Sequence, residues 1–293
     1  MKRILTAVGL AAVVAAISPS LSAQWPSYPA ANMPKTPDGK PDLTAPAPRL
    51  ANGKPDLSGM WSNVRAAGGQ RGQAAAAPVP PAEGPLEPPA PGGPPVATFR
   101  DVGAGFKEGL PFTPWAADLL KKRRADNQKD NPDALCLPMG LMQFHTHGQP
   151  RKIVQTPDIT VMIFEPNYGL RTIFTDGRPL PDNDPNPWWY GYSIGKWDGD
   201  TLVVETTGFR DDVWLDIWGS PLTSTGKMTE RYRRVSYGTL QIDVTIEDPK
   251  AYTKPFTVRV NQRLNLDGDL IEFICLEGQK FDQYLRGDLR PKN

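Results

Sequence analysis

The stretch WWYGYSIGKWDGDTLVVETTGFRDDVWLDIW, residues 188–218, decides the fold of this chain. Within it, residues 190–197 and 201–206 flank the pair Asp198-Gly199. An Asp-Gly pair between two β-prone runs is a strong hairpin signal, because both turn residues must adopt positive φ. The apolar run at 202–204 is typical of a strand that is covered on both faces. The stretch therefore predicts a hairpin at the centre of an antiparallel β domain.

Alternating patterns on either side of this hairpin predict further strands. Residues 240–247 alternate apolar and polar side chains, and residues 256–261 repeat the pattern. Period two is the spacing of a strand with one buried face. Turn-forming residues separate the other expected strands, which are 153–155, 160–165, 170–174, 228–235 and 270–275. Eight to ten short strands with local connections favour a mainly β fold, an antiparallel up-and-down barrel of the lipocalin-like kind, in which closure removes exposed edges.

The chain before the barrel is expected to form one accessory helix and a long extension. Thr113-Pro114 followed by WAADLLKKRR predicts the helix, with Thr113 as N-cap and one face made by Trp115, Leu119 and Leu120. The sequence holds 33 prolines and 27 glycines. Residues 24–110 are expected to form an extended Pro/Gly/Ala-rich region with one strand near 57–63, disordered at 66–97 for want of large apolar side chains. Helix and barrel would then occupy residues 111–293.

The N-terminus predicts export. Lys2 and Arg3 precede an apolar run at residues 4–17, and Ala23 ends a plausible cleavage site, so residues 1–23 read as a Sec signal peptide. The run is shorter than the about 20 residues of a spanning helix, and we expect a periplasmic or secreted protein without a membrane span. Without the leader, the 33 basic residues become 31 against 32 acidic ones. Such a balance disfavours nucleic acid as a partner.

The sequence contains two cysteines, Cys136 and Cys275. In an oxidising compartment a single pair forms a disulfide more often than it remains as two thiols. The alternative, a nucleophilic cysteine, lacks any sequence-level activator. We therefore expect Cys136 to be bonded to Cys275.

Several blocks occur in the order seen in a family of exported bacterial proteins of unassigned activity: GKPDLSGMW, KIVQTPDITVMIFE, RTIFTDGRPLP, GYSIGKWDGDTLVVETTGF, TERYRR and TIEDPKAYTKPF. The chain resembles this family from Asp38 to about Glu277. The resemblance implies a lipocalin-like, calycin-type barrel with a proline-rich N-terminal extension. Relatives carry a His-containing Pro-His-Ser-Glu-like segment where this chain has Pro221-Leu222-Thr223-Ser224. A histidine role at that point therefore does not carry over.

The two histidines, His145 and His147, are the first candidates for chemistry. On a strand, an H-x-H pair would point both imidazoles to one face, as a metal site requires. The third ligand would be Glu165, Glu205 or Asp176. A zinc site usually has three or four protein ligands, so we expect no cofactor and keep a divalent metal at His145 and His147 as the alternative.

Acid–base chemistry without a metal is the second possibility. Either histidine could work with one of four aspartates, Asp176, Asp211, Asp212 or Asp216, because paired carboxyl groups in apolar surroundings acquire different pKa values. Turn and strand-end roles are the simpler explanation for these aspartates. In the run at residues 230–234, an inward arginine could hold an anionic ligand, whereas an outward ladder of ion pairs is the commoner arrangement.

The sequence has no G-x-S-x-G, Walker, dinucleotide or H-E-x-x-H motif, which disfavours the enzyme classes that these motifs define.

The leading hypothesis is a barrel that binds a small apolar, aromatic or sugar-like molecule, because indole and phenol rings offer apolar faces with one polar group each. The alternative is an exported hydrolase, lyase or isomerase with His145 or His147 as base, and a third hypothesis is an interaction role for the proline-rich segment. The sequence does not specify an oligomeric state. The expected binding residues are Trp188, Trp189, Tyr190, Tyr192, Trp214 and Trp218.

Overall fold

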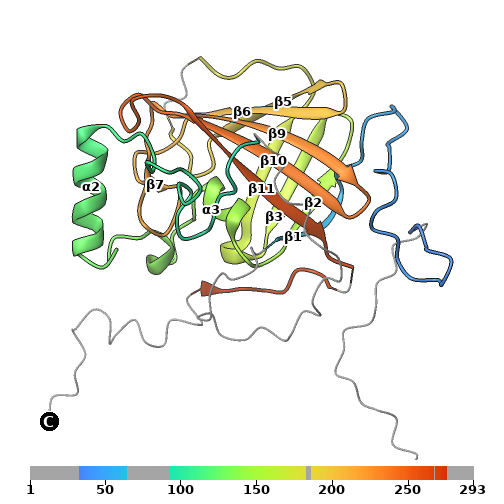
Figure 1. Ribbon diagram of the computed structural model, residues 1–293. Helices are drawn as coiled ribbons and strands as arrows, with labels where there is room; N and C mark the ends of the chain where they lie inside the picture. The colour runs from blue at the N-terminus through green and yellow to red at the C-terminus, as the bar shows by residue number, and fades with distance from the viewer. Residues whose placement is uncertain (1–32, 65–92, 183–185, 267, 276–293) are drawn as a thin grey trace, which may run out of the picture.

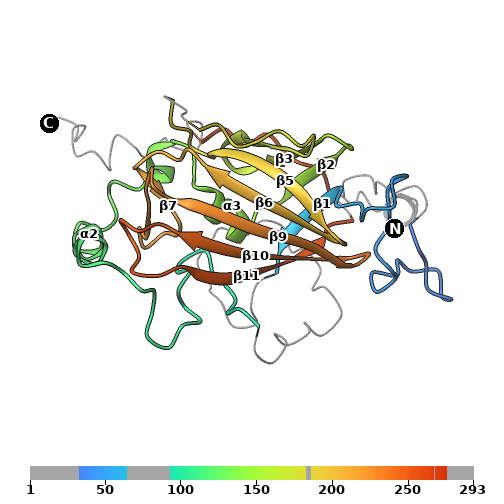
Figure 2. The ribbon, with the colours of Figure 1, turned by 90° about the horizontal axis from the view of Figure 1, so that it is seen from above.

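The computed structural model describes residues 33–64, 93–182, 186–266 and 268–275. Over these residues, nine strands close into a barrel in the order β1-β11-β10-β9-β6-β5-β4-β3-β2 (Figures 1 and 2). The mainly β barrel is therefore confirmed. The barrel strands are β1 (Gly59–Asn63), β2 (Arg151–Gln155), β3 (Ile159–Phe164), β4 (Gly169–Phe174), β5 (Tyr192–Asp198), β6 (Thr201–Thr207), β9 (Lys227–Ser236), β10 (Thr239–Glu247) and β11 (Phe256–Leu264).

Neighbouring strands of the barrel are antiparallel except at one seam. There β4 and β5 run parallel and pair over two positions, Ile173 with Ser193 and Phe174 with Ile194. The long connection between them, residues 175–191, permits this direction because a parallel pair cannot be joined by a tight hairpin. A short hairpin of β7 (Val213–Trp214) and β8 (Pro221–Leu222) leaves the barrel between β6 and β9.

The predicted central hairpin is formed by β5 and β6. Asp198 pairs with Thr201, so the two turn residues are Gly199 and Asp200. Gly199 has φ +57°, which a residue with a side chain rarely adopts. The turn therefore lies one residue further along than the Asp198-Gly199 pair suggested.

The strand expected near 57–63 is confirmed as β1, but the one expected at 270–275 is wrong. Residues 268–274 form no strand, although they continue directly from the region after β11. The reason is topological: β1 already pairs with β11 on one side and β2 on the other, so no edge is open for another strand. The expected signal peptide at 1–23 and most of the segment at 66–97 lie outside the described residues.

The predicted accessory helix is α2 (Pro114–Ala125), and Thr113 accepts a hydrogen bond from the backbone N–H of Ala116. Its buried face differs from the expected one, since Trp115 is 43% exposed while Ala116, Leu120 and Arg123 are buried. The Arg123 guanidinium lies 4.3 Å from the ring centre of Trp214 and donates to the carbonyl of Gly219 at 2.6 Å. These contacts turn the arginine toward the β7–β8 hairpin and Trp115 toward solvent.

A second helix, α3 (Leu141–Thr146), was not expected. All six of its side chains are buried, with contacts to β3, β4 and β9. Figure 1 shows the helix among the strands of the barrel. Gly169 on β4 permits this, because a Cβ at that position would lie 2.5 Å from the Phe144 ring. The helix and its side chains thus fill one end of the barrel interior.

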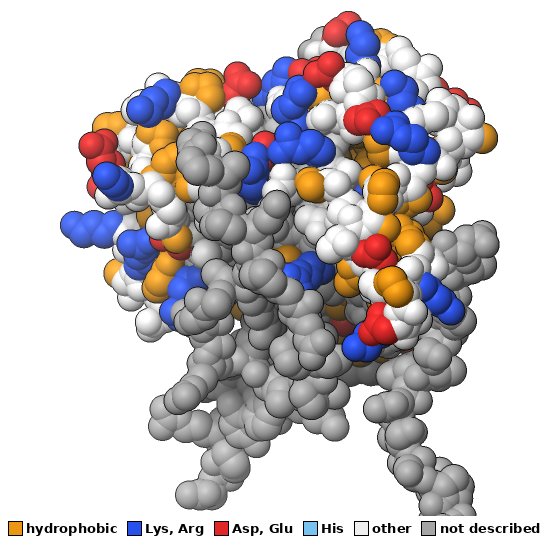
Figure 3. Space-filling view, turned by 45° about the vertical axis from the view of Figure 1, so that its right-hand side comes forward, with side chains coloured by type: hydrophobic (Ala, Val, Ile, Leu, Met, Phe, Trp, Pro, Cys, Tyr) orange, Lys and Arg blue, Asp and Glu red, His pale blue; other side chains and the backbone are white. Residues whose placement is uncertain are grey.

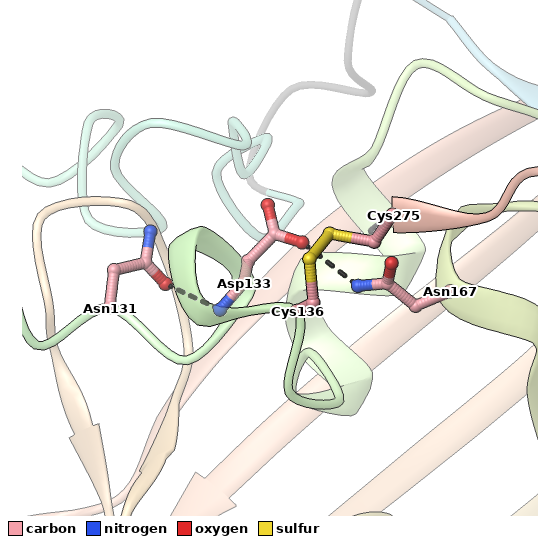
Figure 4. Close-up of a disulfide and its surroundings, with 5 residues drawn as sticks. All are labelled: Asn131, Asp133, Cys136, Asn167 and Cys275. Atoms are coloured by element: carbon pink, nitrogen blue, oxygen red, sulfur yellow. Dashed lines mark hydrogen bonds between the residues drawn. A yellow bond between two sulfur atoms is a disulfide. The ribbon is translucent and has the colours of Figure 1, made fainter. Parts of the chain in front are cut away.

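The disulfide between Cys136 and Cys275 is confirmed (Figure 4). Cys136 directly follows the 3₁₀ turn η1 (Asp133–Leu135), and a second 3₁₀ turn, η2 (Pro166–Tyr168), lies beside it. Asn167 of η2 donates to the Asp133 carboxylate at 3.0 Å, and burial raises the pKa of Asp133. The disulfide therefore ties the segment before α3 to the segment that follows β11.

The surface is mixed in character. Figure 3 shows basic, acidic and apolar side chains interspersed on the face it displays. None of the helices that the structure describes has the length and apolarity of a membrane span.

Candidate functional site

A cluster of polar side chains lies in the barrel interior beneath α3, centred on Glu230 of β9. Its carboxylate receives two hydrogen bonds from the guanidinium of Arg171 on β4. His145 Nε2 lies 2.6 Å from Glu230 Oε1, and the Tyr232 hydroxyl donates to the same oxygen at 2.7 Å. All four side chains are at most 2% exposed. We call these four residues the Glu230 cluster.

The alternation of β9 explains why these groups face inward. Glu230, Tyr232 and Arg234 are buried, while Arg231 and Arg233 on the opposite face are exposed. Of the two arrangements considered for residues 230–234, the outward ladder describes only the exposed arginines, Arg231 and Arg233. The Glu230 carboxylate can face the core because the buried guanidinium of Arg171 compensates its charge there.

Two hydroxyl groups complete the surroundings of Arg171. Its Nε donates to Ser193 Oγ of β5 at 3.1 Å, and its Nη2 donates to Thr206 Oγ1 of β6 at 2.8 Å. The guanidinium is therefore fixed by β5, β6 and β9 at once. A buried charge needs such hydrogen bonds and an ion-pair partner, because an unpaired one destabilises the folded state by several kcal/mol.

The ionisation of the cluster follows from burial and from the ion pair. Burial alone would raise the pKa of Glu230, but Arg171 holds that pKa far below its usual value. Burial lowers the pKa of His145 more than the Glu230 carboxylate raises it, so the imidazole is neutral at pH 7. Because Nε2 faces an ionised carboxylate, Nε2 carries the proton and Nδ1 carries the lone pair.

Next to this cluster, several buried polar atoms have no hydrogen-bond partner among the described residues. Arg151 Nη1 and Gln262 Nε2 both donate to the backbone carbonyl of His145, at 2.9 and 3.2 Å. The partnerless atoms belong to these side chains and to one more residue of α3: His145 Nδ1, Arg151 Nε, Gln262 Oε1 and Gln143 Nε2. Buried polar atoms in proteins are rarely left unsatisfied, so this group marks a place suited to a polar guest.

Aromatic rings pack beside His145, one of the residues with a partnerless atom, and its ring meets that of Phe164 edge-on at 6.5 Å. Phe144, adjacent to His145, stacks on Phe164 with ring centres 4.3 Å apart. The ring of Tyr190 lies 5.4 Å from that of Phe144 and is partly exposed. Burial raises the pKa of Tyr190 to about 12. Arg210 stacks over Trp189, 4.6 Å from its ring centre. We call Phe144, Phe164 and Tyr190 the aromatic cover.

The six aromatic residues expected to bind a ligand lie in different places. Tyr190 belongs to the aromatic cover, Trp189 packs under Arg210, and Trp188, which is 49% exposed, pairs through its backbone with Phe209. Tyr192 instead stacks on Phe174. Farther away, Trp214 is 1% exposed beneath Arg123, and Trp218 lies between the guanidinium groups of two arginines. The structure therefore does not bring the six together around one opening.

The two histidines do not share a face. His145 lies in the last turn of α3, whereas His147 is the residue that caps its C-terminus with an extended backbone, so the H-x-H segment is not a strand. His147 Nδ1 accepts from the backbone of Gln149, and its ring meets Phe99 edge-on. The strand geometry considered for this pair is thus wrong.

The expected carboxylates have partners of their own. Asp176 and Asp212 are exposed and bind Arg178 and Arg210, and these bonds lower the pKa of both. Glu165 accepts from Gln149, and Glu205 pairs with Lys227 at 2.5 Å. Within the described ranges, no three His, Cys, Asp or Glu side chains come together as metal ligands would.

Sequence reasoning missed Glu230, Arg171, Tyr232 and Arg151 as site residues. One signal was present: in GLRTIF, Arg171 stands in phase with Gly169 and Ile173, which face the interior. An arginine in the apolar phase of a strand requires a buried acceptor. The identity of that acceptor was not visible, because Glu230 is 59 positions away.

Two hollows are recorded on the surface. One, about 450 Å³, lies on the outer side of β5 and β6 and is lined by Ile194, Trp197 and Val203 among others. The other, about 430 Å³, lies beside α2 and is lined in part by Lys121 and Arg124. Neither involves the Glu230 cluster or the aromatic cover.

The fold and the site together define a closed β-barrel with a buried ionic cluster beneath a short internal helix. Comparison of the chain with protein-family models, with curated proteins and with solved structures finds no match.

Proposed function

We propose that the protein binds a small, partly apolar molecule at the end of the barrel that α3 and residues 188–190 cover. The observation that carries this proposal is the position of the aromatic cover directly beside buried polar atoms that lack partners. Ligand sites in proteins combine such apolar walls with a few convergent polar groups. Because Phe144 and His145 are adjacent on α3, movement of this helix would expose both kinds of surface together.

The proposal includes export and a lipocalin-like mode of binding. A disulfide that closes a long loop supports an oxidising compartment, since such bonds rarely persist in the cytosol. Barrels of this size hold one small ligand when side chains leave room for it. Here α3 fills that room, so binding requires α3 to shift or Tyr190 to swing outward.

Removal of the Tyr190 ring should weaken binding. In a screen of aromatic, sugar and lipid compounds by tryptophan fluorescence, we expect Tyr190→Ala to bind any hit about five- to tenfold more weakly, because one aromatic contact contributes about 1 kcal/mol or slightly more. Tyr237→Ala is the matched control, since this partly exposed tyrosine lies at the β9–β10 turn against Arg234. Equal losses in both variants, or no hit that stabilises the wild type, would contradict the proposed site.

A second candidate function, an enzyme with His145 as general base, is favoured by one observation. The carboxylate of Glu230 orients His145 through Nε2, which leaves the Nδ1 lone pair as the proton acceptor. A carboxylate that fixes a histidine tautomer is the arrangement used by general bases in several enzyme classes. A substrate would reach Nδ1 only after the same displacement of α3.

The lowered pKa of His145 makes the stability of the protein depend on pH. Because the folded-state pKa of His145 is lowered, the unfolded chain binds more protons below about pH 6.5, and stability should fall as the pH drops through that value. The His145→Asn variant should lack this part of the pH dependence.

Nitrogen NMR should show the Nε2–H tautomer of His145 at pH 7, with His147 as the internal comparison. A proton on Nδ1 at that pH would rule out the base.

A further inference from the structure

We infer that the polar group of the ligand is a carboxylate, bound by the guanidinium of Arg151 beneath α3. This inference rests on the proposed function and adds the ligand class: an aromatic carboxylate, with a hydroxyl group next to the carboxylate as the best fit.

The guanidinium of Arg151 is only partly hydrogen-bonded to the described residues. Nη1 makes its shortest bond, 2.9 Å to the carbonyl of His145, whereas Nη2 reaches the carbonyls of His147 and Gln149 at 3.2 and 3.4 Å. Nε makes no hydrogen bond to any described residue. Nε–H is therefore the donor that no described residue uses, and the two bonds from Nη2 beside it are the longest that Arg151 makes. A carboxylate that accepts from Nε and replaces one of the Nη2 bonds would form a bidentate pair.

The charge balance of the interior favours an anion. Arg171 and Glu230 neutralise each other, and His145 is neutral, so the positive charge of Arg151 remains. None of the ion pairs formed by described residues includes Arg151, which is 0% exposed. Burial lowers the pKa of Arg151 to about 9, as expected for a cation without a carboxylate partner. A bound carboxylate would supply the missing partner.

The remaining partnerless atoms refine the ligand class. Gln143 Nε2 is a second donor, suited to a carboxylate oxygen, whereas His145 Nδ1 and Gln262 Oε1 are acceptors. Acceptors require a donor on the ligand, and a hydroxyl group next to the carboxylate provides one. The aromatic cover suits a ring at the other end of the molecule.

Calorimetric titration with four matched probes tests the inference: mandelate, phenylacetate, phenylacetamide and 2-phenylethanol. We expect mandelate and phenylacetate to bind at least tenfold more tightly than the two neutral compounds, with mandelate tightest. Arg151→Met should abolish this preference and bind the charged and neutral probes alike. Gln143→Leu should reduce the preference only in part.

Two further variants keep the test decisive. Arg259→Met is the matched control, because this buried arginine is already paired with Asp243 at 2.6 Å and should leave the preference unchanged. If Arg151→Met does not fold, Arg151→Lys provides the test. It retains the positive charge but lacks the planar guanidinium with its paired N–H donors, and it should still lose most of the preference for the charged probes.

The outcomes separate this inference from the proposed function. Equal affinity of the wild type for phenylacetate and phenylacetamide overturns the carboxylate assignment and leaves small-molecule binding intact. Unchanged preference in the Arg151 variants moves the anion site elsewhere and also overturns it. Failure of every compound in the wider screen, including the four probes, overturns both.

Discussion

Replacement of Glu230 by glutamine should destabilise the protein by about 3–5 kcal/mol, the range found when one partner of a buried ion pair is removed. The carboxylate compensates Arg171, which is 2% exposed and has no other acidic partner within the described part of the chain. The same change removes the negative acceptor of the bonds from Tyr232 and His145. The folded state would then hold Arg171, in addition to Arg151, without a counter-charge.

Urea unfolding followed by tryptophan fluorescence measures this loss. Asp198→Asn is the matched control: Asp198 pairs with Arg231 on the outer face, where both side chains are largely exposed, and its loss should cost less than about 1 kcal/mol. The double variant Arg171→Met/Glu230→Leu should recover much of the stability, because an apolar pair can replace a buried ionic one. A Glu230→Gln variant within 1 kcal/mol of the wild type would show that the cluster is not a structural ion pair.

Loss of the disulfide should have the second large effect. Cys136 and Cys275 are 139 positions apart and enclose every barrel strand except β1. In the chain-entropy account, a closed loop of this length stabilises the folded state by up to about 5 kcal/mol. The Cys136→Ser/Cys275→Ser variant should therefore unfold at clearly lower urea concentration.

The reductant provides the control for this experiment. Dithiothreitol should lower the stability of the wild type toward that of the double serine variant and leave the variant itself unchanged. A wild type that keeps its full stability after complete reduction, verified by thiol titration, would mean that the bond does not constrain the unfolded chain.

The barrel was predictable because its determinants are local. Gly199 and the β-prone runs beside it specify the central hairpin, and the alternation at 240–247 specifies which side of β10 faces inward. Thr113-Pro114 fixed the start of α2 through one hydrogen bond and a missing N–H. Each of these signals lies within a few residues of the element that it specifies.

The site was not predictable in the same way. Helix α3 has six residues and is buried on all sides, so it shows no amphipathic period for sequence reasoning to detect. The buried face of α2 depended on Trp214, which is far along the chain. His145, considered as a metal ligand, is instead hydrogen-bonded to Glu230, which is 85 positions away.

The sequence by itself determined the compartment expectation, the cysteine pair and most of the barrel strands, because these depend on composition and on the two-residue period of a strand. Only the tertiary structure decided that Arg171, His145 and Glu230 meet and that Arg151 has no acidic partner in the part of the chain that the structure describes. Closure of the barrel around α3 brings these residues together, and burial then strengthens the interactions between their charges.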